Sequence, residues 1–219
     1  QCAGLVVGAP SFKPPTLADP ANQIDRLIRG MADLPGEPWQ VVVLAEPLTD
    51  DQVAEVRNRL IAEMRSTETD IARARMSGAL AASLEEHYLQ LQMFELASLS
   101  RAVATGGWRV AAYLVGTPPS YYRLSSLWRG VFQGDQSEAV PVRVLDDPGV
   151  CDLARQWGMP DLIGVDGGGF YRRPFEHQTL LSSTQLATYV QVPSLETPGF
   201  GVRLAATFEL DANHIRIHG

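Results

Sequence analysis

Lysine is almost absent from this chain of 219 residues, since Lys13 is the only one it contains. A P-loop nucleotide site needs the pattern G-x-x-x-x-G-K-[ST], whose lysine reaches the β- and γ-phosphates. Lys13 is followed by Pro14, so the chain does not supply the lysine and hydroxyl of that motif. The formal net charge of −7 also argues against the clustered positive charge with which nucleic-acid-binding surfaces neutralise phosphates. We therefore expect no nucleotide hydrolysis and no direct nucleic-acid binding by this chain.

Long apolar runs and cysteines are also scarce. No run approaches the ~18 apolar residues that span a bilayer, and no signal peptide is evident at the start. The composition, with 45% apolar and 20% charged residues, is that of a globular protein. We expect a cytoplasmic location, either free or at the periphery of a membrane complex. Cys2 and Cys151 form no C-x-x-C pair, which favours reduced thiols over a disulfide.

Glycine is dense in one stretch, GVDGGGFYRR at 164–173. A dinucleotide-binding fingerprint needs G-x-G-x-x-G between a strand and a helix. Here the three consecutive glycines are followed by Phe170, Tyr171 and two arginines, so that spacing is missing. Asp166 and Gly167 are residues that accept a positive φ in hairpin turns. The pattern favours a turn or loop over a ligand-binding loop.

Two β-α-β patterns organise the first 148 residues. The first has an apolar strand near 2–9, a helix with Asp19 as N-cap and Pro20 at its first position, and a strand at 39–47. Within this last strand, VVVL runs without alternation, as in a strand covered on both faces. The second pattern has its strands at 108–116 and 140–145. Together they predict an α+β fold with a ferredoxin-like βαββαβ arrangement and antiparallel pairing within a four-stranded sheet.

A long helical region separates the two patterns. Thr49 and Gln52 form a capping box at its start, and Gly106 and Gly107 end it. We interpret residues 49–104 as a helical hairpin that protrudes from the sheet, or as one long interrupted helix. One face of its second half is marked by Leu89, Met93, Leu96, Leu99 and Val103.

The tail, residues 149–219, differs in character. It begins with a short helix and the glycine turn, and Ser182 with Gln185 forms a second capping box. The stretch GVRLAATFEL then alternates as a β-strand does. Its apolar positions are Val202, Leu204, Ala206, Phe208 and Leu210.

The stretch LLSSTQLATYVQVPSLETPGFGVR at 180–203 resembles the segment that precedes the motor domain in HerA/FtsK-like P-loop ATPases, which include the conjugative-transfer ATPases of type IV secretion. It shares the leucine- and serine-rich lead, the "T/E-L-A" helix and the "P-x-x-E-x-P-G" turn. The stretches GLVVGAPSF, QIDRLIRGM, WQVVVLAEP and GGWRVAAYLVG are similar to the N-terminal region of such proteins. The resemblance therefore covers most of the chain through packing and turn motifs, without catalytic ones.

The resemblance implies a non-catalytic N-terminal domain for assembly or substrate gating in a hexameric bacterial translocase. Its partners would be its own subunits in a ring. ATP and Mg²⁺ are implied only for a motor domain, which we expect after Gly219, and this chain itself would hold no cofactor. The alternative is a free-standing interaction module that presents its helical hairpin to another protein. A small enzyme is a third hypothesis, for which the sequence offers no convergent titratable residues.

Several residues with chemical potential have simpler explanations. His214 and His218 are four apart, but in an alternating segment their side chains would diverge, which favours surface histidines over a metal site. His87 suits a helix surface. Ser182 is better explained as a helix cap than as a nucleophile served by His177, since no G-x-S-x-G elbow surrounds it. Asp146 and Asp147, which follow a strand, favour a turn over a magnesium site.

Four arginines are the candidate partner contacts. Arg73 and Arg75 lie between the two halves of the helical region, where they could meet a neighbouring subunit or lie in a solvated loop. Arg172 and Arg173 follow the glycine turn and leave the same two alternatives open.

Overall fold

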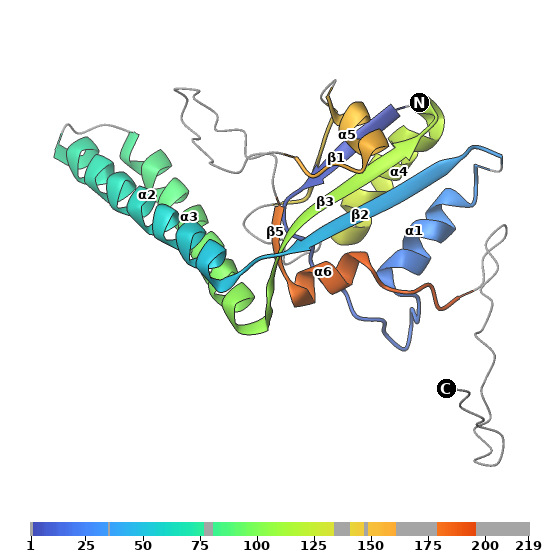
Figure 1. Cartoon of the computed structure of the whole chain (residues 1–219), viewed down its shortest axis with the longest axis horizontal. Helices are drawn as coiled ribbons and strands as arrows, with labels where there is room; N and C mark the ends of the chain where they lie inside the picture. Colours follow the sequence, from blue (N-terminus) through green and yellow to red (C-terminus); the bar gives the residue numbers. More distant parts are fainter. Residues whose placement is uncertain are drawn as a thin grey trace, which may run out of the picture.

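The computed structural model describes residues 2–34, 36–76, 81–133, 141–146, 149–160 and 179–195. Within these ranges the protein is a mixed α+β structure with a five-stranded antiparallel sheet and six helices (Figure 1). The predicted α+β class is therefore confirmed. Because β5 follows residue 149 and still joins this sheet, the tail contributes to the same body as the first 148 residues.

The central strand of the sheet is β3 (Gly107–Gly116). β2 (Trp39–Pro47) pairs with it along its whole length, and β1 (Cys2–Val7) pairs with its second half. β4 (Arg143–Leu145) lies beyond β1, which gives the order β2-β3-β1-β4 with every pair antiparallel. β5 (Thr179–Ser182) pairs with the first part of β3. One edge of β3 is thus shared, end to end, by β1 and β5.

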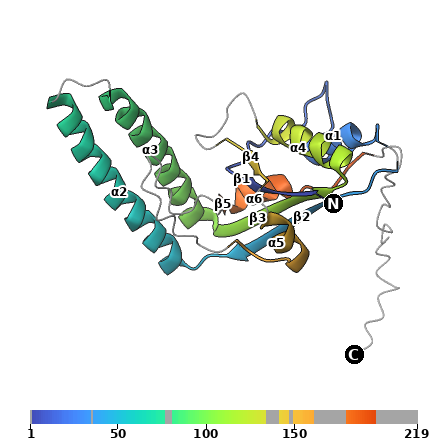
Figure 2. The same ribbon diagram turned by 90° about the horizontal axis from the view of Figure 1, so that it is seen from above.

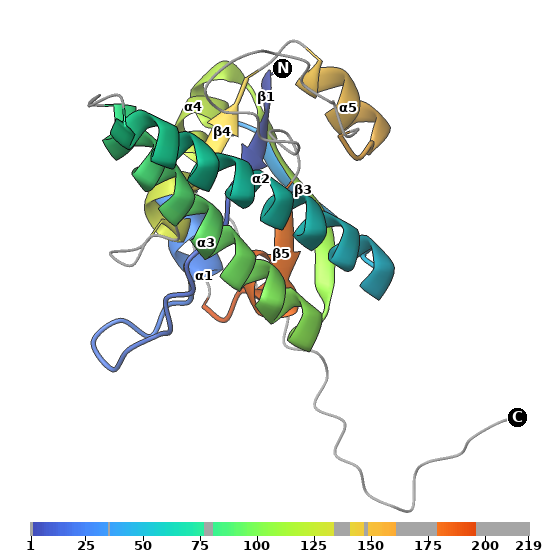
Figure 3. The same cartoon turned by 90° about the vertical axis from the view of Figure 1, so that its left-hand side faces the viewer.

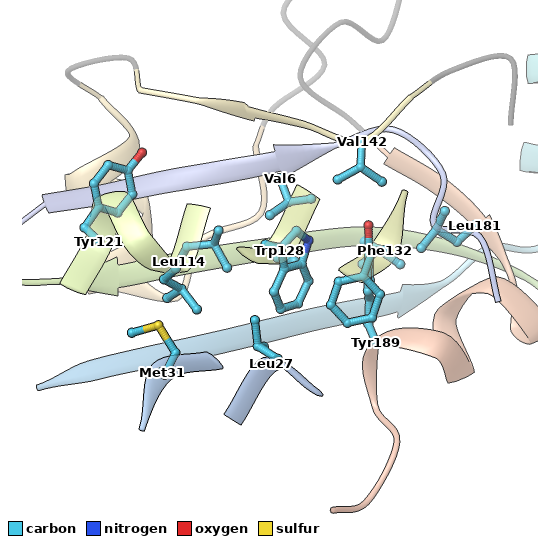
Figure 4. Close-up of a cluster of buried hydrophobic side chains, with 13 residues drawn as sticks. Val6, Leu27, Met31, Leu114, Tyr121, Trp128, Phe132, Val142, Leu181 and Tyr189 are labelled. Carbon is cyan, nitrogen blue, oxygen red and sulfur yellow. The ribbon is translucent and has the colours of Figure 1, made fainter. Parts of the chain in front are cut away.

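Helices cover both faces of this sheet, with α1 (Gln23–Met31) and α4 (Pro118–Phe132) on one side and α5 (Val150–Gln156) on the other (Figure 2). The larger core lies under α1, α4 and α6 (Ser183–Tyr189). Its centre is aromatic: the ring centroid of Trp128 lies 4.3 Å from that of Phe132 and 5.1 Å from that of Tyr189 (Figure 4). Because these rings come from α4 and α6, the core ties the tail of the chain to its middle.

Two long helices, α2 (Asp50–Met76) and α3 (Ala81–Thr105), lie between β2 and β3 in the chain and project from one end of the sheet (Figures 1 and 3). They pack side by side as a hairpin, so the one-helix alternative does not hold. The predicted Thr49–Gln52 capping box is present, with Gln52 N–H donating to Thr49 Oγ1 at 3.3 Å. Gly106 has a φ of +92°, which allows the sharp exit from α3 into β3.

Two local predictions were wrong. The first helix begins at Gln23, not at Pro20, because Asn22 and Asp25 form a reciprocal capping box that Asp19 cannot form. Asp19 instead accepts a hydrogen bond from Ala21 N–H at 3.2 Å in the preceding turn. The strand VVVL, expected to be covered on both faces, lies in β2 at the edge of the described sheet, and its four residues are only half-buried.

Candidate protein-interaction surface

The seam between α2 and α3 is narrow. The residues that α2 buries are Val53, Leu60, Thr67 and Ile71, and those of α3 include Gln92, Leu99 and Ala102. Steps of seven, three and four residues separate them, as in a coiled coil. Such spacing brings one narrow face of each helix into contact with the other helix. The remaining faces of both helices lie outside the seam.

The seam is also polar for a buried interface. Gln92 is 2% exposed, and neither its Oε1 nor its Nε2 has a hydrogen-bond partner among the described residues. Thr67 Oγ1 donates to the carbonyl oxygen of Glu63 at 3.1 Å, and the Tyr88 hydroxyl donates to the Glu63 carboxylate. A buried amide without partners costs about 1–3 kcal/mol relative to its solvated state. The hairpin is therefore held more weakly than its length suggests.

The outer faces of the two helices differ in charge. α2 carries eleven Asp, Glu and Arg residues among its 27, whereas α3 carries four among its 25. Charged side chains on a helix exterior are solvated, and a helix that lacks them exposes apolar surface instead. A protein that contacts α3 therefore removes water from fewer charged side chains than one that contacts α2.

We call Met93, Phe94, Ala97 and Ala104 the α3 stripe, since their spacing places them on one side of α3. Met93 is 57% exposed and Phe94 is 59% exposed, and both alanines are exposed as well. A groove of about 430 Å³ between the two helices reaches the stripe at Met93, the one stripe residue that lines it. It is lined by Glu68, Ile71, Ala72, Arg75, Glu86, Leu89, Gln90 and Met93. Exposed apolar side chains gathered beside a groove are typical of protein contacts.

Sequence reasoning misplaced part of this surface. Met93 and Val103 were expected on the same face as Leu99, yet only Leu99 is buried. The signal was present in the sequence, because α3 has apolar residues over more of its circumference than a single partner helix can cover.

The two described candidate arginines lie at the tip of the hairpin, on the last turn of α2. Arg73 Nη1 is 3.0 Å from Asp70 Oδ1, and Arg75 Nη2 is 2.6 Å from Glu86 Oε1 of α3. Arg75 thus links the two helices near their connection. Their contact with a partner remains a prediction, and Arg172 and Arg173 lie outside the described residues.

The other chemical candidates are engaged structurally or lie outside the description. Ser182 caps α6, and its Oγ lies 3.2 Å from Gln185 Oε1. Asp146 accepts a hydrogen bond from the Tyr121 hydroxyl, and His87 is exposed on α3. No group of three or more His, Cys, Asp or Glu side chains that could hold a metal occurs in the described ranges. Residues 164–173, Asp147, His177, His214 and His218 fall outside these ranges.

Cys2 and Cys151 are free thiols, and both line a small hollow of about 160 Å³ beside α5. Among the helices of the described part, none combines the length and apolarity needed to cross a membrane.

One carboxylate binds the last described residues of the chain to α1. Asp25, in the first turn of α1, accepts hydrogen bonds from Ser194 N–H at 2.8 Å, Ser194 Oγ at 2.6 Å and Leu195 N–H at 3.1 Å. Burial raises the pKa of Asp25, but these hydrogen bonds, with one from Asn22 N–H, outweigh it and hold the pKa below its ordinary value. The ionised carboxylate therefore fastens residues 194 and 195 to the start of α1.

Comparison with known proteins gives no relative: no family model, no curated protein and no solved structure matches this chain.

Proposed function

We propose that this chain is a non-catalytic assembly or substrate-gating domain of a ring-forming HerA/FtsK-like translocase, in which the hairpin α2–α3 contacts a neighbouring subunit. The observation that carries the proposal is the α3 stripe, an exposed apolar surface on a hairpin that projects from the sheet. The resemblance of residues 180–203 to the segment before the motor supplies the kind of assembly.

Charge favours a second copy as the partner of the stripe. The whole chain has a formal net charge of −7, so copies repel one another over most of their surfaces. The four residues of the α3 stripe carry no charge, and the charged residue exposed between Ala97 and Phe94 on the same side of α3, Arg101, is positive, so contact there brings no negative charges together. ATP and Mg²⁺ belong in this proposal to a motor domain outside the chain, and no catalytic residue is assigned to the residues described.

We also propose that the sheet has the ferredoxin-like arrangement. The order β2-β3-β1-β4, with helices α1 and α4 linking β1 to β2 and β3 to β4, supports this proposal. In this view the hairpin replaces the turn between β2 and β3, and β5 with α6 is an addition to the basic unit.

A free-standing interaction module is the second candidate function. The same stripe supports it, with a different protein as the partner in place of a second subunit. The two proposals differ in what the natural protein does: a translocase subunit hydrolyses ATP as a hexamer through its motor domain, whereas an interaction module has no hydrolytic activity.

The test uses the longest natural protein that contains this chain. Met93→Ser with Phe94→Ser should weaken its self-association in sedimentation by about tenfold or more, because the centre of a contact carries most of the binding energy. Asn58→Ser with Arg65→Ser, on the exposed face of α2, is the matched control and should leave the association unchanged. ATP hydrolysis is measured on the same samples. A hexamer that hydrolyses ATP and weakens only with the first pair supports the translocase proposal, and an inert monomer contradicts it.

A further inference from the structure

The outer edge of β2 has no partner strand among the described residues. β2 is nine residues long and ends the strand order on its side of the sheet. Leu48, which follows it, donates its N–H to Gly107 O of β3 at 2.9 Å. Because backbone direction alternates along an antiparallel strand, every second residue before Leu48 also faces β3. The residues between them turn their N–H and C=O groups outward, and these are Trp39, Val41, Val43 and Ala45.

An apolar groove of about 660 Å³, which we call the β2–α1 groove, lies beside this edge. Ile24 and Ile28 line it from α1, and Val41 and Val43 line it from β2. Trp128, in the centre of the larger core, forms part of its lining as well (Figure 4). The volume lies within the range of about 300–1,000 Å³ that is typical of ligand sites.

The groove and the outward backbone groups coincide at Val41 and Val43. Both side chains lie on the face of the sheet that carries the larger core and line the groove, while their N–H and C=O groups lie on the open edge. An extended peptide that pairs with β2 here would therefore place every second side chain in the groove. Because the lining from α1 is aliphatic, aliphatic side chains fit best.

The charge of the groove favours a basic residue at one end of such a peptide. Among the described residues that line the groove, only Glu37 is charged, and it lies just before Trp39 in the chain. Its carboxylate accepts a hydrogen bond from the Thr117 hydroxyl, which fixes its position. The formal net charge of the whole chain is −7, so a cationic peptide is attracted and an anionic one is repelled.

A second copy of the chain fits this edge poorly. Its own β2 contains Glu46 and no basic residue that could meet Glu37. Two β2 edges joined about a two-fold axis would also bring both α1 helices to the same face of the joined sheet. Figure 1 shows α1 beyond the outer edge of β2. Two helices, each about 10 Å wide, would then meet over strands about 4.8 Å apart, whereas a single peptide strand brings no helix with it.

We propose that the β2–α1 groove binds an extended peptide of a partner protein, with aliphatic side chains at alternate positions and a lysine or arginine at one end. The peptide adds to β2 as a strand: its backbone bonds to Val41 and Val43, its aliphatic side chains fill the groove, and its basic residue meets Glu37. The bound strand covers the run VVVL, which the described residues leave half-buried. The site is separate from the α3 stripe, so the proposal goes beyond the assembly function and is independent of it.

Calorimetric titration of the whole chain with synthetic peptides tests the site. The probe is acetyl-KTVTVTVK-amide, whose valines all face one way in a strand and whose lysines serve either direction of binding. The control, acetyl-KTTTVVVK-amide, has the same composition but divides its valines between both faces. The probe should bind about tenfold more tightly, because it buries more valine surface in the groove. Equal affinities, or no binding of the probe, overturn the proposal.

Two variants of the chain separate the backbone contact from the charge contact. Val41→Pro removes an N–H that β3 does not use, which an edge strand tolerates, and should weaken binding of the probe by about tenfold or more. Glu37→Gln keeps an acceptor for Thr117 and should weaken it by about threefold, as expected for a solvent-accessible ion pair. Binding of the neutral peptide acetyl-STVTVTVS-amide should not respond to Glu37→Gln. An unchanged affinity for the probe in either variant overturns the proposal.

Hydrogen exchange identifies what occupies the edge. In the chain alone, the Val41 and Val43 amides should exchange rapidly, whereas those of Val42 and Leu44, which face β3, should be protected. The probe should slow the exchange of Val41 and Val43 by about tenfold or more and leave the other two unchanged. Protection of Val41 and Val43 without the probe overturns the proposal. If that protection grows with protein concentration, a second copy covers the edge, and if it does not, the chain covers its own edge.

Discussion

The sheet core, where helices pack on the sheet, and the hairpin seam, where α2 packs on α3, bury different kinds of side chain. The sheet core contains Trp128, Phe132 and Tyr189 in mutual contact. The seam contains Gln92 without partners and Thr67 bonded to its own helix. Large apolar side chains stabilise a fold in proportion to the area they bury, and buried polar groups do not. The sheet thus fixes the shape of the protein, while α3 keeps much of its apolar surface outside.

The largest effect is expected in the sheet core. Trp128 is fully buried and contacts rings from two helices, so Trp128→Ala should lower the free energy of unfolding by about 3–5 kcal/mol. Urea denaturation followed by circular dichroism measures it. A loss below about 1 kcal/mol would contradict the contrast between core and seam.

The junction of the tail with α1 should be next. Asp25→Asn places an amide donor against N–H donors and should cost about 1–3 kcal/mol. Because the fold lowers the pKa of Asp25 below 3.8, its stabilisation is present above that pH and is lost as the pH falls through the lowered value.

Unfolding measured from pH 7 down to pH 2 checks this prediction. The difference in stability between the original chain and Asp25→Asn should shrink below about pH 4. A difference that is constant across this range would show that the charge of Asp25 is not involved.

The seam should respond in the opposite direction to substitution. Gln92→Leu removes a buried amide without partners and should stabilise the hairpin by about 1 kcal/mol. Hydrogen exchange of the α2 and α3 amides measures the local gain. Faster exchange in the variant would mean that the amide of Gln92 has a stabilising role.

The smallest effect is expected at the hairpin tip. The pair of Arg75 with Glu86 is more than 45% exposed on both sides, and exposed ion pairs contribute little. Arg75→Ala should change the unfolding free energy by less than about 0.5 kcal/mol. Comparing its denaturation curves at low and high salt checks this value, since a larger loss that disappears in salt would indicate a stronger pair.

Much of the fold could be predicted because local signals agree with it. The capping boxes at Thr49 and Ser182 mark helix starts that the structure confirms, and apolar runs mark the strands. These signals act within a few residues. The pairing of β5 with β3 was not predicted, because it joins residues about 70 positions apart that carry no mutual signal.

The candidate surface was harder to predict. An apolar position on a helix does not name what buries it: Met93 was placed on the same face as Leu99, yet Leu99 is buried and Met93 is exposed. Arg75 was a candidate partner contact, with a solvated loop as the alternative; the structure pairs it with Glu86 within the hairpin, and its contact with a partner remains a prediction. Both outcomes depend on the position of α2 relative to α3, which helix periodicity alone does not determine.

The shared edge of β3 has a consequence for the order of folding during synthesis. The hairpin contains neighbouring segments of the chain, so it can form as soon as both helices have left the ribosome. The sheet body is completed only when β5 and Tyr189 arrive, because they fill the rest of the β3 edge and cover Trp128. We therefore expect the hairpin α2–α3 to fold during synthesis before the sheet is complete. Protease resistance of nascent chains stopped before and after Tyr189 tests this order of folding.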